Sequence, residues 1–197
     1  MQPTTPWRTQ APRLMPDVMP MNTGSAVLIR EARPSDAQEL ARLRWDSRGE
    51  DEPGHSRIEF LNDCETWLRE ALSSGPWVIA AAESEPNSLC GCMFLQCIPK
   101  VPAPGANRRA WGYITNAYVD YRQRSHGIGR KLLDLLIEAA RNRKLEFLIV
   151  WPSEAAVAFY NRAGFRSVSE VHVGSDDEPP LELMLSVAVG VESPGTA

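Results

Sequence analysis

One segment of the sequence constrains the fold more than any other, because it joins a β-rich pattern to a long amphipathic helix through a short loop with two glycines. The segment reads YVDYRQRSHGIGRKLL, and the helical pattern continues to residue 144. Basic residues fill the last turn, where they complement the negative end of the helix dipole. One face of the predicted helix is apolar and contains Ile128, Leu132, Leu135, Leu136 and Ala139. No other part of the chain has so clear a helical pattern.

The loop before this helix predicts a binding site for an anion. Backbone N–H groups at a helix start have no intrahelical acceptor and meet the positive end of the helix dipole. Gly127 and Gly129 let the backbone approach a ligand without an intervening Cβ, and Arg124 and Arg130 can bind phosphate oxygens. A pyrophosphate fits such a loop, and a plain turn with two solvent-facing arginines is the alternative. The loop lacks the Lys-Ser/Thr pair of a Walker motif and the third glycine of a dinucleotide fingerprint.

The rest of the chain reads as further strands and helices joined by turn-forming residues. Strands are predicted at residues 26–32, 77–82, 89–98, 110–120, 145–151, 165–171 and 181–187. Helices are predicted at 34–45, with Ser35 or Asp36 as N-cap, at 60–72, at 128–144 and at 153–164, with Gly164 after the helix end. The order is β-α-α-β-β-β-α-β-α-β-β, and three successive strands indicate an antiparallel meander.

Composition limits the domain organisation and the partners. Residues 1–25 hold five of the sixteen prolines and predict a disordered leader, residues 26–189 one domain, and residues 190–197 a flexible tail. A net charge of −4, with no basic surface of the usual kind, argues against nucleic acid as a partner. No apolar stretch is long enough to cross a membrane and no signal peptide is visible, so we expect a cytoplasmic protein.

The cysteines predict no metal site. Cys90 and Cys92 lie two residues apart in a strand pattern, so we expect them on one face of a sheet. A C-x-C pair without a second pair or clustered histidines is typical of small buried thiols in a reducing compartment.

Two motifs resemble those of the GNAT family of N-acetyltransferases. RSHGIG, at Arg124 to Gly129, resembles the family's acetyl-CoA signature Q/R-x-x-G-x-G/A, and AAVAFYNRAGF, at Ala155 to Phe165, resembles its second motif. The resemblance extends over Val27 to Val187. It implies the GNAT fold, an α/β (α+β) architecture with a mixed, mostly antiparallel sheet flanked by helices, and acetyl-CoA as co-substrate.

The resemblance also assigns roles to residues. It implies that Tyr160 protonates the departing thiolate of CoA and that the pantetheine lies against the strand before the loop. Many relatives have Asn where this chain has Ser153, which can bond the pantetheine or serve only as a helix N-cap. The implied acetyl-CoA contacts come from Tyr118, Val119, Arg124, Ser125, His126, Gly127, Ile128, Gly129, Arg130 and Ser153.

The general base and the acceptor stay open. Some protein-directed members carry a glutamate where this chain has Tyr113, so that base is missing, and an amine of ordinary pKa needs one at pH 7. The candidates are Glu83, His55 and the acids Glu50, Asp51 and Glu52. We expect direct attack by the amine of a small molecule in a ternary complex. A protein or peptide N-acetyltransferase and a non-catalytic acyl-CoA-binding module are the alternatives, and a homodimer is possible.

Overall fold

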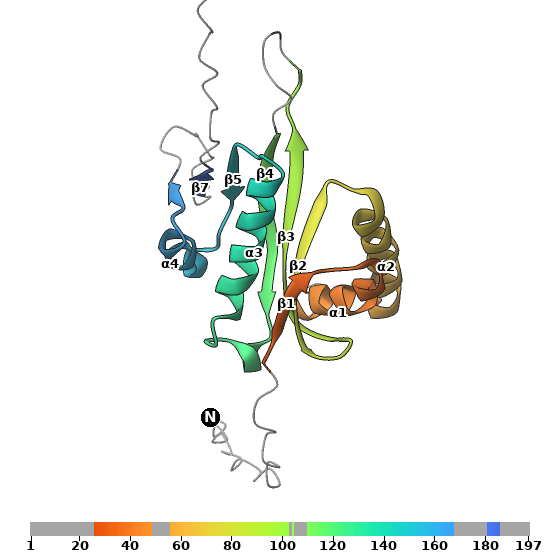
Figure 1. Ribbon diagram of the computed structural model, residues 1–197. Helices are drawn as coiled ribbons and strands as arrows, with labels where there is room; N and C mark the ends of the chain where they lie inside the picture. Colours follow the sequence, from red (N-terminus) through yellow and green to blue (C-terminus); the bar gives the residue numbers. More distant parts are fainter. Residues whose placement is uncertain (1–25, 49–55, 103, 105–109, 168–180, 186–197) are drawn as a thin grey trace, which may run out of the picture.

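The computed structural model describes residues 26–48, 56–102, 104, 110–167 and 181–185. Within these residues the chain forms a seven-stranded sheet of order β1-β2-β3-β4-β5-β7-β6, with helices on both faces (Figure 1). β4 and β5 run parallel, and the other neighbouring strands in this sheet run antiparallel. The predicted mixed and mostly antiparallel sheet is therefore confirmed. No helix of the described part is long and apolar enough to cross a membrane.

The element order agrees with the predicted order. The strands are β1 (Leu28–Glu31), β2 (Trp77–Glu85), β3 (Ser88–Pro99), β4 (Ala110–Val119), β5 (Phe147–Val150), β6 (Arg166–Ser167) and β7 (Leu181–Met184). The helices are α1 (Ala37–Arg48), α2 (Arg57–Ser74), α3 (Ile128–Asn142) and α4 (Glu154–Arg162), with the 3₁₀ turns η1 (Pro34–Asp36) and η3 (Tyr121–Gln123). The second helix begins earlier than predicted, because the Ser56 side chain accepts the N–H of Glu59 and caps it. Gly164, with φ of 98°, follows α4 as predicted.

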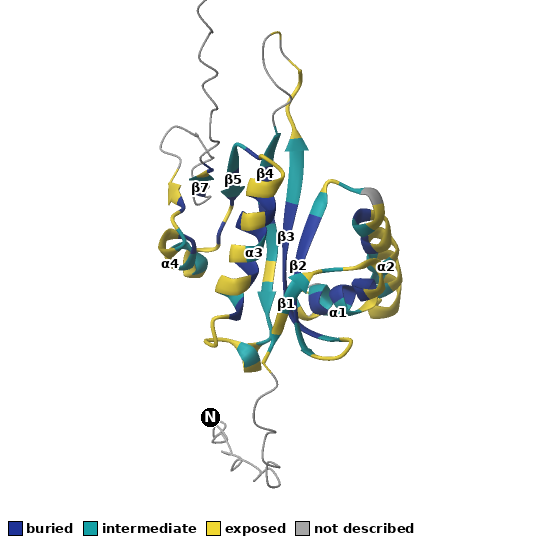
Figure 2. Ribbon diagram, viewed as in Figure 1, coloured by how far each residue is buried: buried dark blue, intermediate teal, exposed yellow. Residues whose placement is uncertain are grey.

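Each face of the sheet has its own core, and β3 contributes to both (Figure 2). Met93 and Leu95 pack with the apolar face of α3, while Phe94 packs with the residues of α1 and α2. Successive side chains of a β-strand point to opposite faces of the sheet, so a strand that is buried on both faces contributes alternate residues to two cores. The sheet thus separates α3 from the α1–α2 pair, and α3 and α1 both contact β4.

The expectation that Cys90 and Cys92 share a face is wrong. Cys90 lies in the core beneath α3, whereas Cys92 lies in the core beneath α1 and α2. Ala82 pairs with Gly91 and Glu83 with Leu89, so Cys90 is an extra residue in β3. Such a β-bulge breaks the alternation of side chains, and the residue spacing alone does not reveal it.

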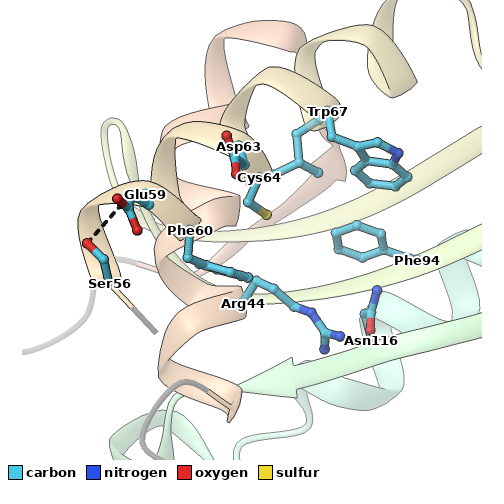
Figure 3. Close-up of a pocket in the computed structure, with 10 residues that line it drawn as sticks. Arg44, Ser56, Glu59, Phe60, Asp63, Cys64, Trp67, Phe94 and Asn116 are labelled. Atoms are coloured by element: carbon cyan, nitrogen blue, oxygen red, sulfur yellow. Dashed lines mark hydrogen bonds between the residues drawn. The ribbon is translucent and has the colours of Figure 1, made fainter. Parts of the chain in front are cut away.

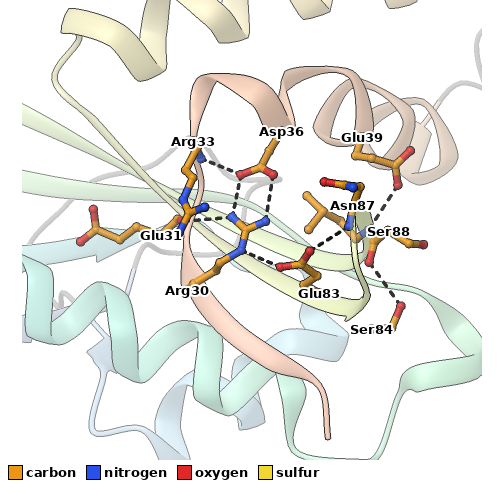
Figure 4. Close-up of polar contacts among 10 residues, drawn as sticks. Arg30, Glu31, Arg33, Asp36, Glu39, Glu83, Ser84, Asn87 and Ser88 are labelled. Atoms are coloured by element: carbon orange, nitrogen blue, oxygen red, sulfur yellow. Dashed lines mark hydrogen bonds and ion pairs between the residues drawn. The ribbon is translucent and has the colours of Figure 1, made fainter. Parts of the chain in front are cut away.

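An ion-pair network fixes the start of the domain (Figure 4). Arg30 on β1 donates to both carboxylate oxygens of Asp36, at 2.7 and 2.9 Å, and to Glu83 on β2 at 2.8 Å. Asp36 also accepts the backbone N–H of Arg33 at 2.6 Å. Asp36 therefore closes the η1 turn that precedes α1, rather than capping α1 directly. The Arg30 guanidinium holds the pKa of both carboxyl groups below the usual range.

Candidate active site

The parallel strands β4 and β5 pair over a short distance only. Their ladder joins Gly112, Tyr113 and Ile114 to Leu148, Ile149 and Val150, and β4 then continues to Val119 without β5 beside it. The strand direction changes at Asn116, which has φ of 49° at a register shift against β3. The chain after Val150 turns away through Pro152, which has no N–H to donate. One edge of β4 is therefore left open inside the molecule.

A cavity of about 320 Å³ lies where the two strands separate. β4 contributes Tyr113 and Asn116 to its wall, and the turn after β5 contributes Trp151 and Ser153. Tyr113 contacts Trp151 edge to face, with ring centroids 5.3 Å apart. Some protein-directed GNAT members carry a glutamate base at the position that Tyr113 occupies here. The wall of this cavity therefore offers no carboxylate at that position.

Tyr160 forms the inner end of this cavity. It is 3% exposed and packs edge to face against Phe159 and Phe165. Burial raises its pKa to about 12. No described residue forms a hydrogen bond with its hydroxyl. The ring is thus fixed by packing, while the hydroxyl keeps its proton at neutral pH and is available to a ligand.

Ser153 lies at the N-cap position of α4, but its side chain makes no capping hydrogen bond. Its carbonyl accepts the N–H of Ala156 at 2.8 Å, which starts the helix. The residue is exposed and lines the same cavity as Tyr160. Its hydroxyl therefore accepts no backbone N–H group in the first turn of α4 and can bind a ligand in the cavity.

The glycine loop borders a second cavity, of about 730 Å³, at the start of α3. Gly127, the N-cap residue, has φ of 75°, and a Cβ added to it would meet nothing within 4 Å. Ser125 also has positive φ, at 66°. No side chain caps α3. The first N–H groups of the helix are therefore open to a ligand from outside, as an anion site requires.

The basic residues of the loop already have protein partners. Arg124 donates from Nε to the carbonyl of Val119 at 2.9 Å. Arg130 donates to Asp134 at 2.8 Å and to the carbonyl of Arg162 at 3.4 Å. Each guanidinium keeps further N–H groups beyond these bonds. Both arginines are exposed and line the loop cavity.

The structure brings nearly all the predicted loop residues to one cavity. The residues that line it include Arg124, Ser125, Gly127, Ile128, Gly129 and Arg130. His126 instead lines a cavity on the other side of the loop and bonds the Gln123 carbonyl at 3.3 Å. Its side chain is thus placed apart from the others.

Val119 is the strand residue best placed to meet a ligand between β4 and β5. It pairs with Gly91, and the next residue, Asp120, donates its N–H to the Cys90 carbonyl at 2.8 Å. In an antiparallel ladder this alternation turns the N–H and C=O of Val119 away from β3. By the same alternation Tyr118, the partner of Cys92, directs its main chain toward β3, and its side chain lines the cavity between β4 and β5.

A fourth cavity, of about 450 Å³, lies between α1, α2 and the central strands (Figure 3). Phe60, Trp67 and Phe94 give it aromatic walls, and Glu59 and Asp63 supply carboxylates. Arg44 and Asn116 line both this cavity and the one that contains Tyr160. Sequence reasoning missed these residues. The helical spacing of Glu59, Phe60, Asp63 and Trp67 was the available signal, but it does not show which element they face.

The candidate bases fall outside this arrangement. Glu83 is paired with Arg30, and it lines neither the cavity of Tyr160 nor the one between α1 and α2. Glu50, Asp51, Glu52 and His55 lie outside the described residues. Among the described residues, no group of three His, Cys, Asp or Glu side chains could hold a metal ion.

Comparisons with known proteins agree with this geometry. The sequence model of the Acetyltransferase (GNAT) family matches residues 37–165. A predicted acetyltransferase from Clostridium acetobutylicum, solved with acetyl-CoA, has a TM-score of 0.60 and 24% identity, covering 74% of this chain and 94% of its own. An acetyltransferase from Trypanosoma brucei has a TM-score of 0.58 and 25% identity, covering 75% and 98%.

Glucosamine-6-phosphate N-acetyltransferase from Arabidopsis thaliana is also similar, with a TM-score of 0.60 and 21% identity over 78% of this chain and 100% of its own. No curated protein sequence matches this chain. The family match covers more than half of the chain and includes both motifs, and therefore both the glycine loop and Tyr160. The chain belongs to the GNAT family of acetyltransferases.

Proposed function

We propose that this protein transfers the acetyl group of acetyl-CoA to the primary amine of a small molecule, by direct attack in a ternary complex. One observation carries the proposal. Two adjacent residues of β4 line different cavities: Val119 lines the one at the uncapped start of α3, which suits a pyrophosphate, and Tyr118 lines the one that contains Tyr160. Tyr160 is buried, and its hydroxyl lacks a partner among the described residues. Acetyl-CoA has an anionic end and a reactive thioester end, and the two cavities offer a site for each.

The proposed donor site uses the main chain of the loop and of β4. The pyrophosphate binds the N–H groups at the start of α3, with Arg124 and Arg130 beside it. The pantetheine lies along the open edge of β4, where Val119 presents its main chain, much as an added strand would bind. Ser153 offers its hydroxyl from the opposite wall. The backbone conformation at residue 129 does not require a glycine, but Gly129 leaves the surface of the loop without a Cβ.

The proposed chemistry needs one acid and one route for a proton. The amine nitrogen attacks the thioester carbonyl, so a C–N bond forms and the C–S bond breaks. Tyr160 gives its proton to the departing thiolate, and its raised pKa ensures that the proton is present at neutral pH. We call the cavity between α1, α2 and the central strands the acceptor cavity. The amine loses its proton through water toward Glu59 or Asp63, the two carboxylates of this cavity.

The size of the acceptor cavity favours a small molecule. Its volume of about 450 Å³ lies within the range of about 300 to 1,000 Å³ typical of small-molecule sites.

The proposed place of action is the cytoplasm. The four cysteines are free thiols, which suits this reducing compartment.

The test is a screen of amines and peptides with acetyl-CoA, read by CoA release and by mass of the product. We expect an N-acetylated small amine from the wild type and release slower by about tenfold or more from Tyr160→Phe. Acetylation of peptides alone would overturn the small-molecule acceptor. Absence of any acetylated product from a preparation that binds CoA would overturn the transfer itself.

A further inference from the structure

Two polar side chains meet where the acceptor cavity joins the cavity of Tyr160. Arg44 comes from α1 and Asn116 from the bulge in β4, and Figure 3 shows the Arg44 guanidinium directed toward Asn116. They alone are shared by the walls of both cavities among the described residues. A ligand that occupies both cavities would therefore lie beside them.

Arg44 has no carboxylate partner in the described part of the chain. The contrast with Arg42, two residues earlier on α1, is direct, because Arg42 bonds Glu39, Asp46 and the Leu89 carbonyl. Arg44 is partly buried, and burial lowers its pKa. A partly buried cation that no described residue pairs with costs free energy, and a ligand anion bound there would offset that cost.

Asn116 adds a second unsatisfied group at the same place. No described residue bonds its side-chain amide, which can donate through its nitrogen. A guanidinium and an amide that converge on one point are donors suited to a carboxylate, which accepts several hydrogen bonds. The two carboxylates of the cavity, Glu59 and Asp63, form no ion pair with Arg44.

The wall beyond Arg44 is apolar. Trp67 and Phe94 both contact the ring of Trp77, which holds them in place, and Leu68 is buried beside them. Phe60 is held against Trp45, with centroids 5.5 Å apart. A flat or branched apolar group can fill this space and remove apolar surface from water.

We propose that the acceptor is an α-amino acid with a large apolar side chain. This rests on the proposed acetyl transfer and names its substrate class. The carboxylate binds Arg44 and Asn116, the side chain occupies the aromatic cavity, and the amine points toward Tyr160. An α-amino acid carries its amine and its carboxylate on the same carbon. This arrangement matches the position of Arg44 and Asn116 at the wall of the cavity of Tyr160. An amide or a peptide N-terminus lacks that carboxylate.

The experiment compares L-phenylalanine with L-phenylalanine amide, and with L-alanine, as acceptors for acetyl-CoA. We expect the wild type to favour the acid over the amide by about tenfold or more in kcat/KM, and phenylalanine over alanine. Arg44→Gln should remove the preference for the acid, and Arg44→Lys, which keeps the charge without the planar fork, should retain part of it. Arg57→Gln, at an exposed arginine that lines neither cavity, is the matched control and should behave as wild type.

Calorimetry with L-phenylalanine and the CoA-bound protein gives a readout independent of turnover, and we expect binding that Arg44→Gln weakens about tenfold. The substrate class is overturned if the amide is acetylated as well as the acid, or if Arg44→Gln changes KM for acetyl-CoA instead of the acceptor. Those results leave the acetyl transfer intact. If the protein binds acetyl-CoA but acetylates no amine, the proposed function falls, and this inference falls with it.

Discussion

The Arg124 guanidinium donates from Nε to the carbonyl of Val119 at 2.9 Å. The bond joins the glycine loop to the end of β4, the two places where the proposed donor site needs main-chain groups. It also uses the one carbonyl of Val119 that the β3 ladder leaves free. The loop and the strand edge are therefore positioned by one side chain.

Arg124→Ala should weaken CoA binding by about ten- to a hundredfold, because it removes the proposed phosphate contact and the bond to Val119 together. The melting temperature should change little, since the side chain is exposed. Calorimetry with CoA measures the affinity. Arg141→Ala, in the last turn of α3 and exposed, is the control. Equal affinity of the Arg124 variant and the wild type would contradict the role of this arginine.

Tyr160→Phe removes the hydroxyl and keeps the aromatic packing with Phe159 and Phe165. We expect kcat to fall by roughly ten- to a thousandfold, with CoA affinity and melting temperature almost unchanged. Steady-state kinetics and calorimetry on one preparation measure both quantities. A wild-type kcat, with chemistry shown to be rate-limiting, would leave Tyr160 as a packing residue only. Loss of CoA binding would point to a structural role.

Asp36→Asn should destabilise the domain by about 1 to 3 kcal/mol, because it weakens two charge-assisted hydrogen bonds from Arg30, which keeps Glu83 as a charged partner. The native pKa of Asp36 is lowered, so its contribution is present above the unfolded pKa near 4 and is lost as pH falls through the native value. Denaturant unfolding at pH 7 and at pH 3 measures this. The variant and the wild type should differ less at pH 3, and an equal difference at both values would contradict the linkage.

Removal of residues 1–24 should leave the melting temperature and CoA affinity nearly unchanged. These residues lie outside the described part of the chain, and their sequence shows no apolar periodicity. Thermal unfolding of the shortened protein is the measurement. A fall of several degrees would show that the segment packs on the domain.

Local pattern predicted most of the fold. The apolar face of α3 and the continuous apolar runs of β2 and β3 each identify an element without reference to the rest of the chain. The two bulges, at Cys90 and Asn116, were not predictable because an extra residue leaves no mark in the spacing.

The glycine loop, the proposed donor site, could be singled out in the sequence because its residues are contiguous and match a motif. The proposed acceptor cavity could not, because its residues come from α1, α2, β3 and β4. Arg44 reads in the sequence as one more charge on a helix. Only the packing of α1 and α2 against the sheet shows that Arg44 lacks a described partner and that it borders both cavities.

Calorimetric titration of acetyl-CoA into the wild type, Gly127→Ala and Gly127→Glu tests the central claim most directly, because the site is built on the start of α3. A Cβ at Gly127 meets open space, so alanine costs only the strain of its positive φ and should retain binding. Glutamate adds the same Cβ and a negative charge where the pyrophosphate should lie, and should reduce affinity by about a hundredfold or more. Equal binding of acetyl-CoA by the wild type and the glutamate variant would contradict the account.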